Sequence, residues 1–445
     1  MEYGTMENTI AIFALGAKAE VGFDDAGNLS DQVEASLTAK GIKTYNTKLV
    51  VSDFNSAERA ADLLKHENIS AILVCVATWS DDSYVLQFLK EMDKPIILHA
   101  FPHMESGSLC GVMQIASVMR DIGFTNYRTV YAAPGSEKSA EDIIEALGCF
   151  GEEQETGAVD KAFFIGSIGG RCAGMTEIAF DEFALFEKCG AIVVNISESE
   201  LEEKVKKVSP GETAKVLDDL YGRGYRIDST PEDMKQAVRY YLAMKALIGK
   251  YGLSGLAIKC YTRFMGKICL GYSLLSDEGY VCSCEGDVNS AVMMKIMKEV
   301  TGQCVNNTDI LNPLPEENEI IFAHCGSSGF SIAPDADEVH LAPVRIMDTG
   351  VCSLFRPKTG TVTAADLVGH GDSLRMSVMT GEAVEKEYLF PGNQACIRFE
   401  RDVVDICRDV IGKACGHHWM VGYGDVRKEL KEYCEAHGII FQDIT

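Results

Sequence analysis

The chain is poor in basic residues, in proline and in long apolar runs. Lys and Arg number 41 against 66 Asp and Glu, which gives a formal net charge of −25, and Pro occurs only 11 times. Nucleic acids and anionic membranes are bound by clustered Lys and Arg, so the acidic balance argues against both as partners. No run approaches the roughly 18 consecutive apolar residues of a membrane-spanning helix. We therefore expect a folded protein that binds neither nucleic acid nor membrane.

Signals for secretion and for disulfide bonding are also missing. Residues 1–9 are polar, and the apolar run 10–15 is too short for the core of a signal peptide. The 16 Cys are scattered, and no two have Cys-x-x-Cys spacing. Disulfide scaffolds are short chains dense in cysteine, and structural zinc sites use closely spaced pairs. These features predict a cytoplasmic protein with reduced thiols.

The first third of the chain alternates strand-length apolar runs with helical segments. The apolar runs cover residues 9–16, 71–78, 95–100 and 129–133. Continuous apolar strands separated by helices are typical of a parallel sheet that is buried on both faces. We therefore assign residues 1–155 to a doubly wound, Rossmann-like α/β domain, which ends in an acidic, Gly-containing linker over 149–159.

The alternation restarts after the linker and gives way to a different pattern near residue 312. Strands are predicted at 162–168, 191–196, 255–260 and 280–284, and helices at 175–188 and 231–251. This predicts a second doubly wound α/β domain over 156–311. Short β-rich runs separated by Gly, Pro and Asp then predict a small antiparallel, barrel-like β domain with a terminal helix over 312–445.

The first candidate for chemistry follows the strand predicted at 280–284. That apolar run is followed by Glu285, Gly286 and Asp287 before a helix begins. The carboxyl ends of parallel strands are where open α/β sheets bind ligands. We interpret Asp287 as the N-cap of the helix. Glu285 precedes the cap position and has no comparable structural explanation.

Further polar residues follow downstream. Asp309 lies 24 residues after the first carboxylate, in the Asn-rich segment 306–311, which is predicted as a loop. His324 ends an apolar run, and His417 and His418 form a pair in a Gly-containing segment. Each of these residues also has an ordinary structural explanation. Together, two carboxylates and imidazoles without a thiolate suit Mn²⁺ or Mg²⁺ before Zn²⁺.

Several strings resemble the L-fucose isomerase/L-arabinose isomerase superfamily in order and approximate spacing. They are VCVATWSDDSYVLQFLKEMDKPIILHA at 74–100, AIKCYTRF at 257–264, CEGDVNSAVMMKIMKEVTG from residue 284, NNTD at 306–309, AHCG at 323–326 and GHHWMVGYGD at 416–425. The resemblance extends over most of the chain at the level of motifs. It specifies the superfamily rather than the substrate.

The resemblance implies an aldose–ketose isomerase that uses Mn²⁺, with Mg²⁺ or Co²⁺ as substitutes. Glu285 and Asp309 resemble the two catalytic carboxylates, which are also metal ligands in the superfamily. His418 resembles the histidine ligand, and His324 resembles an additional histidine ligand of the arabinose branch. The superfamily also implies a homo-oligomer, a trimer or hexamer, that acts on a small sugar.

The proposed chemistry explains why two carboxylates and a metal ion are needed. Isomerisation moves a hydrogen between C1 and C2 through a cis-enediol, so one group removes a proton while another protonates an oxygen. Each such group contributes about 10²–10⁴-fold to the rate. A divalent ion polarises the carbonyl and offsets the repulsion between two neighbouring carboxylates.

Four other residues are candidates for substrate contact. Arg171 follows the Gly-rich turn after the strand at 162–168, which is either a plain tight turn or a backbone anion site for a phosphate or sulfonate. Trp79 follows a strand, and its ring either stacks on the sugar or packs against other residues of the protein. His99 and His103 follow the next strand, near the same predicted sheet edge.

Two other classes of function stay open at the level of sequence. A metal-dependent aldolase or lyase uses a similar enediolate but releases two fragments, so product analysis separates it from an isomerase. A non-catalytic sugar-binding protein also has α/β domains around a cleft, and its metal content would distinguish it. A nicotinamide dehydrogenase is disfavoured because the Gly-x-Gly-x-x-Gly fingerprint is absent.

Overall fold

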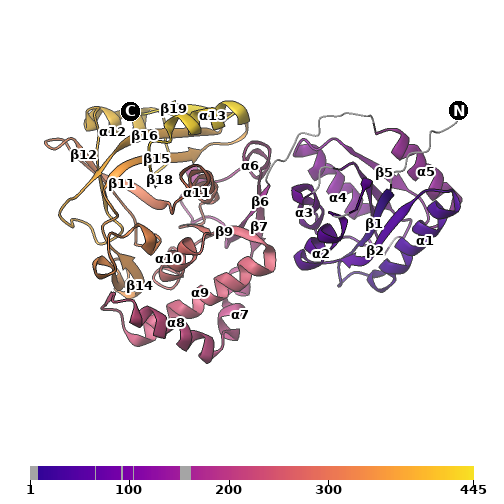
Figure 1. The fold of residues 1–445 in the computed structure, drawn as a ribbon, viewed down its shortest axis with the longest axis horizontal. Helices are drawn as coiled ribbons and strands as arrows, with labels where there is room; N and C mark the ends of the chain where they lie inside the picture. The colour runs from indigo at the N-terminus through magenta and orange to yellow at the C-terminus, as the bar shows by residue number, and fades with distance from the viewer. Residues whose placement is uncertain (1–8, 66, 92–93, 104, 151–161) are drawn as a thin grey trace. The chain divides into compact units, whose positions relative to one another are not determined.

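The computed structural model describes residues 9–65, 67–91, 94–103, 105–150 and 162–445, and these divide into two compact units. Unit 1 comprises Met1–Ala162 and unit 2 comprises Phe163–Thr445 (Figure 1). The linker predicted over 149–159 and the boundary predicted at 155/156 lie largely or wholly outside the described residues. Within the described part of the chain, no helix combines the length and apolar character needed to span a membrane.

Unit 1 is built on one parallel sheet with the strand order β2-β1-β3-β4-β5. The strands are β1 (Thr9–Leu15), β2 (Thr44–Val51), β3 (Ile69–Val76), β4 (Ile96–Ala100) and β5 (Tyr127–Tyr131). The helices are α1 (Ala26–Ala39), α2 (Phe54–Leu64), α3 (Ser83–Glu91), α4 (Ser108–Asp121) and α5 (Glu137–Gly148). Helix α1 packs beside α5, and α2 packs beside α3. A sheet in which the first strand lies between the second and the third is typical of doubly wound folds.

Unit 2 contains a parallel sheet with the order β10-β9-β6-β7. Its strands are β6 (Phe163–Ile168), β7 (Ala191–Ile196), β9 (Leu253–Ile258) and β10 (Val281–Ser283). The helices of unit 2 are α6 (Glu182–Cys189), α7 (Glu198–Lys207), α8 (Pro210–Gly222), α9 (Pro231–Tyr251), α10 (Cys269–Asp277), α11 (Val288–Thr301), α12 (Val403–Gly412) and α13 (Arg427–His437).

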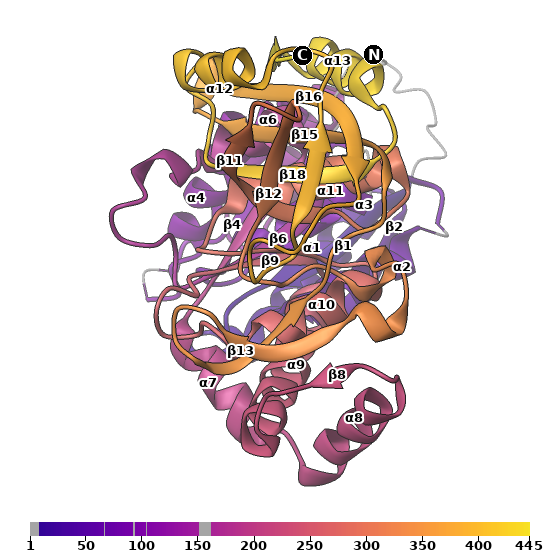
Figure 2. The same ribbon diagram turned by 90° about the vertical axis from the view of Figure 1, so that its left-hand side faces the viewer.

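A second, mainly antiparallel sheet of unit 2 has the order β15-β18-β11-β12-β17-β16-β19. Its strands are β11 (Asn306–Leu314), β12 (Glu319–Ala323), β15 (Gly360–Val368), β16 (Arg375–Val384), β17 (Ala395–Arg398), β18 (His418–Tyr423) and β19 (Ile440–Asp443). Because β15 also pairs with β16, the strands from β15 to β16 close into a ring. Helices α12 and α13 lie along this sheet (Figure 2). A small sheet joins β8 (Arg226–Ile227), β13 (His340–Val344) and β14 (Thr349–Leu354).

Helix α11 connects the two larger sheets of unit 2. It contacts β6, β9 and β10 of the parallel sheet as well as β11, β15 and β18 of the antiparallel sheet. Its residues Val292, Met293 and Met297 are fully buried in one core with Ile165 of β6 and Met420 of β18. A helix that is apolar on most of its faces needs such an enclosed position. The start of α11 is therefore held between two sheets.

Three sequence expectations need correction. The helix predicted over 175–188 is interrupted, because Asp181 accepts hydrogen bonds from the amides of Phe183 and Ala184 and so starts α6 at Glu182. The segment 306–311 is part of strand β11 rather than a loop, since it pairs with both β12 and β18. The domain boundary predicted at 311/312 consequently falls inside that strand, in a unit that extends from Phe163 to Thr445.

Candidate metal centre

Glu285 sits in a tight turn between β10 and α11. Its backbone is left-handed, with φ 65°, and Gly286 follows with φ 75°. A Cβ on Gly286 would lie 2.0 Å from the carbonyl oxygen of Gly170, so only glycine fits at this close approach. The Glu285 carbonyl accepts a hydrogen bond from the Cys172 amide (2.9 Å), and its own amide donates to Cys260 Sγ (3.3 Å). The loop after β6 and the segment after β9 thus fix the backbone of Glu285.

The antiparallel sheet supplies the other candidate ligands. Asp309 of β11 stands opposite Ala323 of β12 and opposite His418 of β18. His324 directly follows Ala323. Residues directly opposite each other in neighbouring antiparallel strands have their side chains on the same face of the sheet. Strand pairing therefore brings together residues that are more than one hundred positions apart in the sequence.

The side-chain donor atoms of this cluster form two overlapping groups that share His418. Glu285 Oε2 is 3.6 Å from His418 Nε2, and His418 Nε2 is 3.9 Å from Asp309 Oδ1. His324 Nε2 is 3.9 Å from Asp309 Oδ2. These distances are too long for hydrogen bonds but suit donor atoms that surround a common ion. Glu285, His324 and His418 form one group whose ligand atoms all lie within 4.8 Å of one another, and Asp309, His417 and His418 form a second.

Burial of unpartnered atoms supports the fit of a cation. Glu285 Oε2, Asp309 Oδ1 and His418 Nε2 are buried and have no hydrogen-bond partner among the described residues. Buried polar atoms are nearly always satisfied, and a buried charge without a partner is costly. Two carboxylate oxygens and an imidazole nitrogen are donors that Mn²⁺ accepts. The donor set therefore fits a divalent ion of this kind.

The electrostatics of the cluster favour an ionised Glu285. Burial by itself would raise the pKa of this carboxyl, but the neighbouring His417 imidazole and the charges of His418 and His324 outweigh burial and lower it. The contact with Glu285 raises the pKa of His417 to about 9, with further help from Asp309 and Glu177. Burial would lower the pKa of His324, but the effects of Asp309 and Cys325 together outweigh burial and raise it.

His417, the first residue of the predicted histidine pair, also lies at this site. Its Nε2 is 3.5 Å from Glu285 Oε2, while Nδ1 of the same ring contacts Glu177. Two further residues at this site were not singled out from the sequence. Asn289 of α11 and Asn307 of β11 are buried, and neither amide has a hydrogen-bond partner among the described residues. Both Asn residues belong to the strings that carry the resemblance, which was the only signal for them.

The interpretation of Asp287 as the N-cap of α11 is confirmed, since its side chain accepts a hydrogen bond from the Ser290 amide (3.0 Å).

Arg171 lies in the loop that packs against the Glu285 turn. Its side chain is half-buried and donates to the carbonyl oxygen of Cys172 (3.3 Å), the residue whose amide binds the Glu285 carbonyl. Gly169 and Gly170, which precede it, both have positive φ. No carboxylate of the described residues forms an ion pair with this guanidinium. The loop is thus adjacent to the candidate site and carries a free cation there.

Trp79, His99 and His103 belong to unit 1. Trp79 is 39% exposed and donates from Nε1 to Gln114 (2.8 Å), and His103 is exposed and accepts a hydrogen bond from the Ser106 amide (3.1 Å). His99 is completely buried, with Nε2 3.2 Å from the carbonyl oxygen of Ala132. A fully buried ring offers no surface to a sugar, so the structure gives His99 a packing role instead of the predicted contact.

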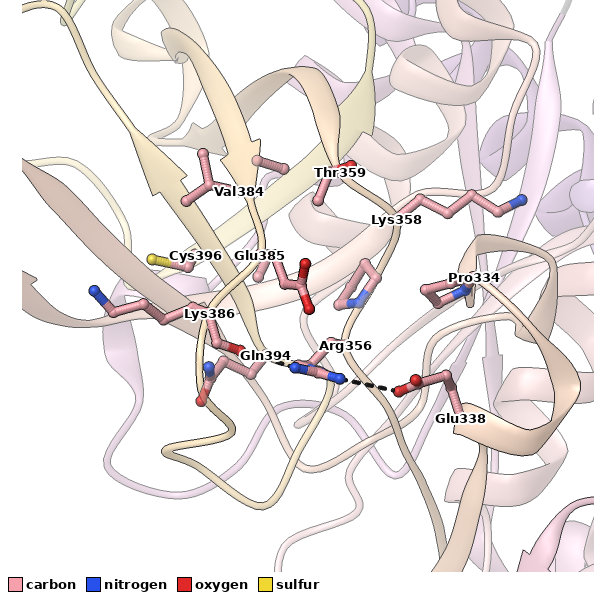
Figure 3. Close-up of a pocket in the computed structure, with 13 residues that line it drawn as sticks. Pro334, Glu338, Arg356, Lys358, Thr359, Val384, Glu385, Lys386, Gln394 and Cys396 are labelled. Atoms are coloured by element: carbon pink, nitrogen blue, oxygen red, sulfur yellow. Dashed lines mark hydrogen bonds and ion pairs between the residues drawn. The ribbon is translucent and has the colours of Figure 1, made fainter.

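A cavity of about 550 Å³ in unit 2 is lined by none of the candidate site residues (Figure 3). Its cations are already paired: Arg356 with Glu338 at 3.2 Å, and Lys386 with Glu319 at 2.9 Å. The Lys358 ammonium donates to the carbonyl oxygen of Ser331 (2.9 Å). Each of these three cations therefore already has a partner.

Comparison with known proteins points to carbohydrate isomerases. The family model for the fucose/sulfoquinovose isomerase N-terminal domain matches residues 26–150. A sulfoquinovose isomerase of Alkalicoccus urumqiensis is 24% identical over 374 residues, which cover 81% of this chain and 83% of that protein. Another from Clostridium sp. (strain MSTE9) is 24% identical over 368 residues, 79% and 81% of the two chains. An L-arabinose isomerase of Enterobacter sp. (strain 638) is 22% identical over 291 residues, 60% and 57% of the two chains.

Proposed function

We infer that this chain, a member of the fucose/arabinose isomerase superfamily, is an aldose–ketose isomerase, and we propose that it works with a divalent metal ion. The observation that carries the proposal is the meeting of Glu285, Asp309 and His418, each with a buried, unpartnered donor atom. These three residues would hold the ion, with His324 as a further ligand and Mn²⁺ as the proposed metal.

The carboxylates of Glu285 and Asp309 would exchange the roles of base and acid. The lowered pKa of Glu285 keeps it ionised at neutral pH, as a base must be to remove the proton next to the carbonyl. The other carboxyl group protonates the oxygen, and the same steps reverse at the neighbouring carbon. A divalent ion held by these residues would supply polarisation of the carbonyl. His417, with a pKa of about 9, places a positive charge beside Glu285 while negative charge develops on the substrate.

We propose that the substrate is a sugar that carries a sulfonate. Relatives along most of the chain are sulfoquinovose isomerases. A protein with a net charge of −25 repels anions, so an anionic sugar needs a local cation. Arg171, in a turn with two left-handed glycines next to the Glu285 loop, is the proposed anion contact. That Trp79 and His103 contact the sugar stays a prediction from the sequence.

Product analysis with defined metals tests the function. The protein is stripped with a chelator and then incubated with sulfoquinovose, L-fucose or L-arabinose in the presence of Mn²⁺, Mg²⁺ or Co²⁺. The expected result is formation of a ketose of unchanged carbon number only after a metal is restored. Cleavage into two fragments, or full turnover without metal, would contradict the proposal.

The sulfonate contact is tested with a matched pair of substrates. Replacement of Arg171 by Gln removes the charge and keeps a polar side chain. We expect the KM for sulfoquinovose to rise by about tenfold or more, as for the loss of a charge-assisted hydrogen bond, while the KM for the uncharged 6-deoxy analogue stays the same. An equal change for both sugars would place Arg171 outside the anion site.

We also propose that the protein is cytoplasmic and that it forms a homo-oligomer, a trimer or a hexamer, as the superfamily resemblance implies for the assembly. The scattered cysteines are free in all described positions, which accords with a reducing compartment. Mass photometry of the purified protein tests the assembly, and a monomer would contradict this part of the proposal.

A further inference from the structure

The carboxylate of Asp287 has two separate partners. Oδ1 accepts the hydrogen bond of the Ser290 amide (3.0 Å), which caps α11. Oδ2 lies 2.8 Å from His418 Nδ1 and also accepts from the Ser290 hydroxyl (2.5 Å). Asp287 and His418 are both only 3% exposed. A cap needs only one oxygen, so the cap does not account for the contact with His418.

The two nitrogens of His418 face different surroundings. Nδ1 meets the Asp287 carboxylate, whereas Nε2 has no hydrogen-bond partner among the described residues and lies 3.6 Å from Glu285 Oε2. An ionised carboxylate only accepts hydrogen bonds, so it places the imidazole proton on Nδ1. The lone pair of the neutral ring is then on Nε2, at the candidate metal centre.

We propose that Asp287 is a positioning residue that fixes the tautomer and orientation of His418 for metal binding. The proposal rests on the function proposed above and adds a residue that does not itself touch the ion. Carboxylates that accept from the distal nitrogen of a ligating histidine raise its basicity, and their loss lowers metal affinity by about 10–100-fold. One side chain thereby couples the start of α11 to the metal centre.

Two variants separate this role from the helix cap. In Asp287→Asn the amide oxygen can still cap α11, because Asn is as good an N-cap as Asp. Its Nδ2 group would donate to His418 Nδ1 and so favour the wrong tautomer. In Ser290→Ala the hydroxyl contact to Asp287 is lost, but the contact between Asp287 and His418 stays.

The experiment is calorimetric titration of the metal-free, full-length protein with Mn²⁺. We expect Asp287→Asn to weaken the Kd by about 10–100-fold and Ser290→Ala to leave it unchanged, with equal helix content by circular dichroism. An unchanged Kd in Asp287→Asn, or equal weakening in both variants, would overturn the proposal. A wild-type protein that does not bind Mn²⁺ would instead refute the proposed function as well.

A measurement on the unaltered chain covers the case in which Asp287→Asn does not fold. Histidine-selective ¹⁵N NMR of the metal-free protein reports the tautomer of each ring, and the His418 signal is assigned by its loss in His418→Gln. We expect the proton on Nδ1. A proton on Nε2 of the neutral ring would overturn the proposal.

Discussion

At the scale of single residues, the proposed chemistry depends on the charge of the Glu285 carboxylate rather than on the size of this side chain. Glu285→Gln keeps the size of the side chain and removes the base, so we expect activity to fall by about 10²–10⁴-fold or more while the fold persists. Initial rates of ketose formation and circular dichroism measure the two effects. Glu187→Gln, an exposed change on α6, is the matched control and should keep full activity. Turnover at the wild-type rate in Glu285→Gln would remove this residue from the mechanism.

The buried His99 gives unit 1 a dependence on pH. Burial lowers the pKa of His99 to about 4, against an ordinary value of 6.5. Between these values the unfolded chain binds a proton that the folded chain does not, so stability falls as the pH is lowered from 6.5 to 4. The difference corresponds to about 3 kcal/mol. Above pH 6.5 both states are neutral and this effect vanishes.

Urea unfolding of wild type and His99→Gln at pH 7 and pH 4.5 measures the contribution. Taking the difference between the two proteins cancels the titration of the other groups. We expect wild type to lose more unfolding free energy than the variant on going to the lower pH. Equal losses in the two proteins would show that His99 titrates normally in the folded state.

At the scale of elements, the turn between β10 and α11 depends on Gly286. Gly286→Ala adds a Cβ that would lie 2.0 Å from the Gly170 carbonyl oxygen, so the turn that carries Glu285 must shift. Gly302, at the other end of α11, has a similar φ of 68°, but a Cβ added there would meet no atom within 4 Å. Gly302→Ala therefore adds only the left-handed strain, about 1–2 kcal/mol.

The two glycine variants form a matched pair. We expect both to lower the melting temperature, but only Gly286→Ala to lower kcat severely, because a displacement of about 1 Å at a catalytic group costs about 10²-fold. Kinetics at saturating sugar and metal, together with thermal unfolding, provide the comparison. Equal kcat values in the two variants would mean that the turn tolerates displacement.

At the scale of the whole molecule, all candidate metal ligands belong to unit 2. An ion that binds only the folded state stabilises it by about 2.7 kcal/mol at one hundred times its Kd. Hydrogen exchange of the intact protein with and without Mn²⁺ should show slower exchange in α11, β11 and β18. Strands β1 and β3, which contain no proposed ligand, serve as the internal control. Slower hydrogen exchange with Mn²⁺ in unit 1 alone would contradict the assignment of the metal ligands to unit 2.

Local patterns in the sequence determined much of the secondary structure. Helix α9 spans the predicted residues 231–251, and β1, β3 and β4 lie within one or two residues of their predicted positions. These segments are buried on both faces or strongly periodic, so their composition reports their environment directly. Strand β2 was missed because it is an edge strand whose residues are mostly half-buried and include Thr, Asn and Lys. Its pairing with β1 outweighs its weak local signal.

The site shows the same division between local and tertiary information. The sequence by itself determined that Glu285 follows an apolar strand and that Asp287 caps a helix, since both depend on neighbouring residues. Only the tertiary structure decided that Asp309 lies in a strand, that this strand sets it opposite His418, and that Asp287 contacts that ring. Such contacts arise from pairing and burial between distant segments, which no local pattern of residues encodes.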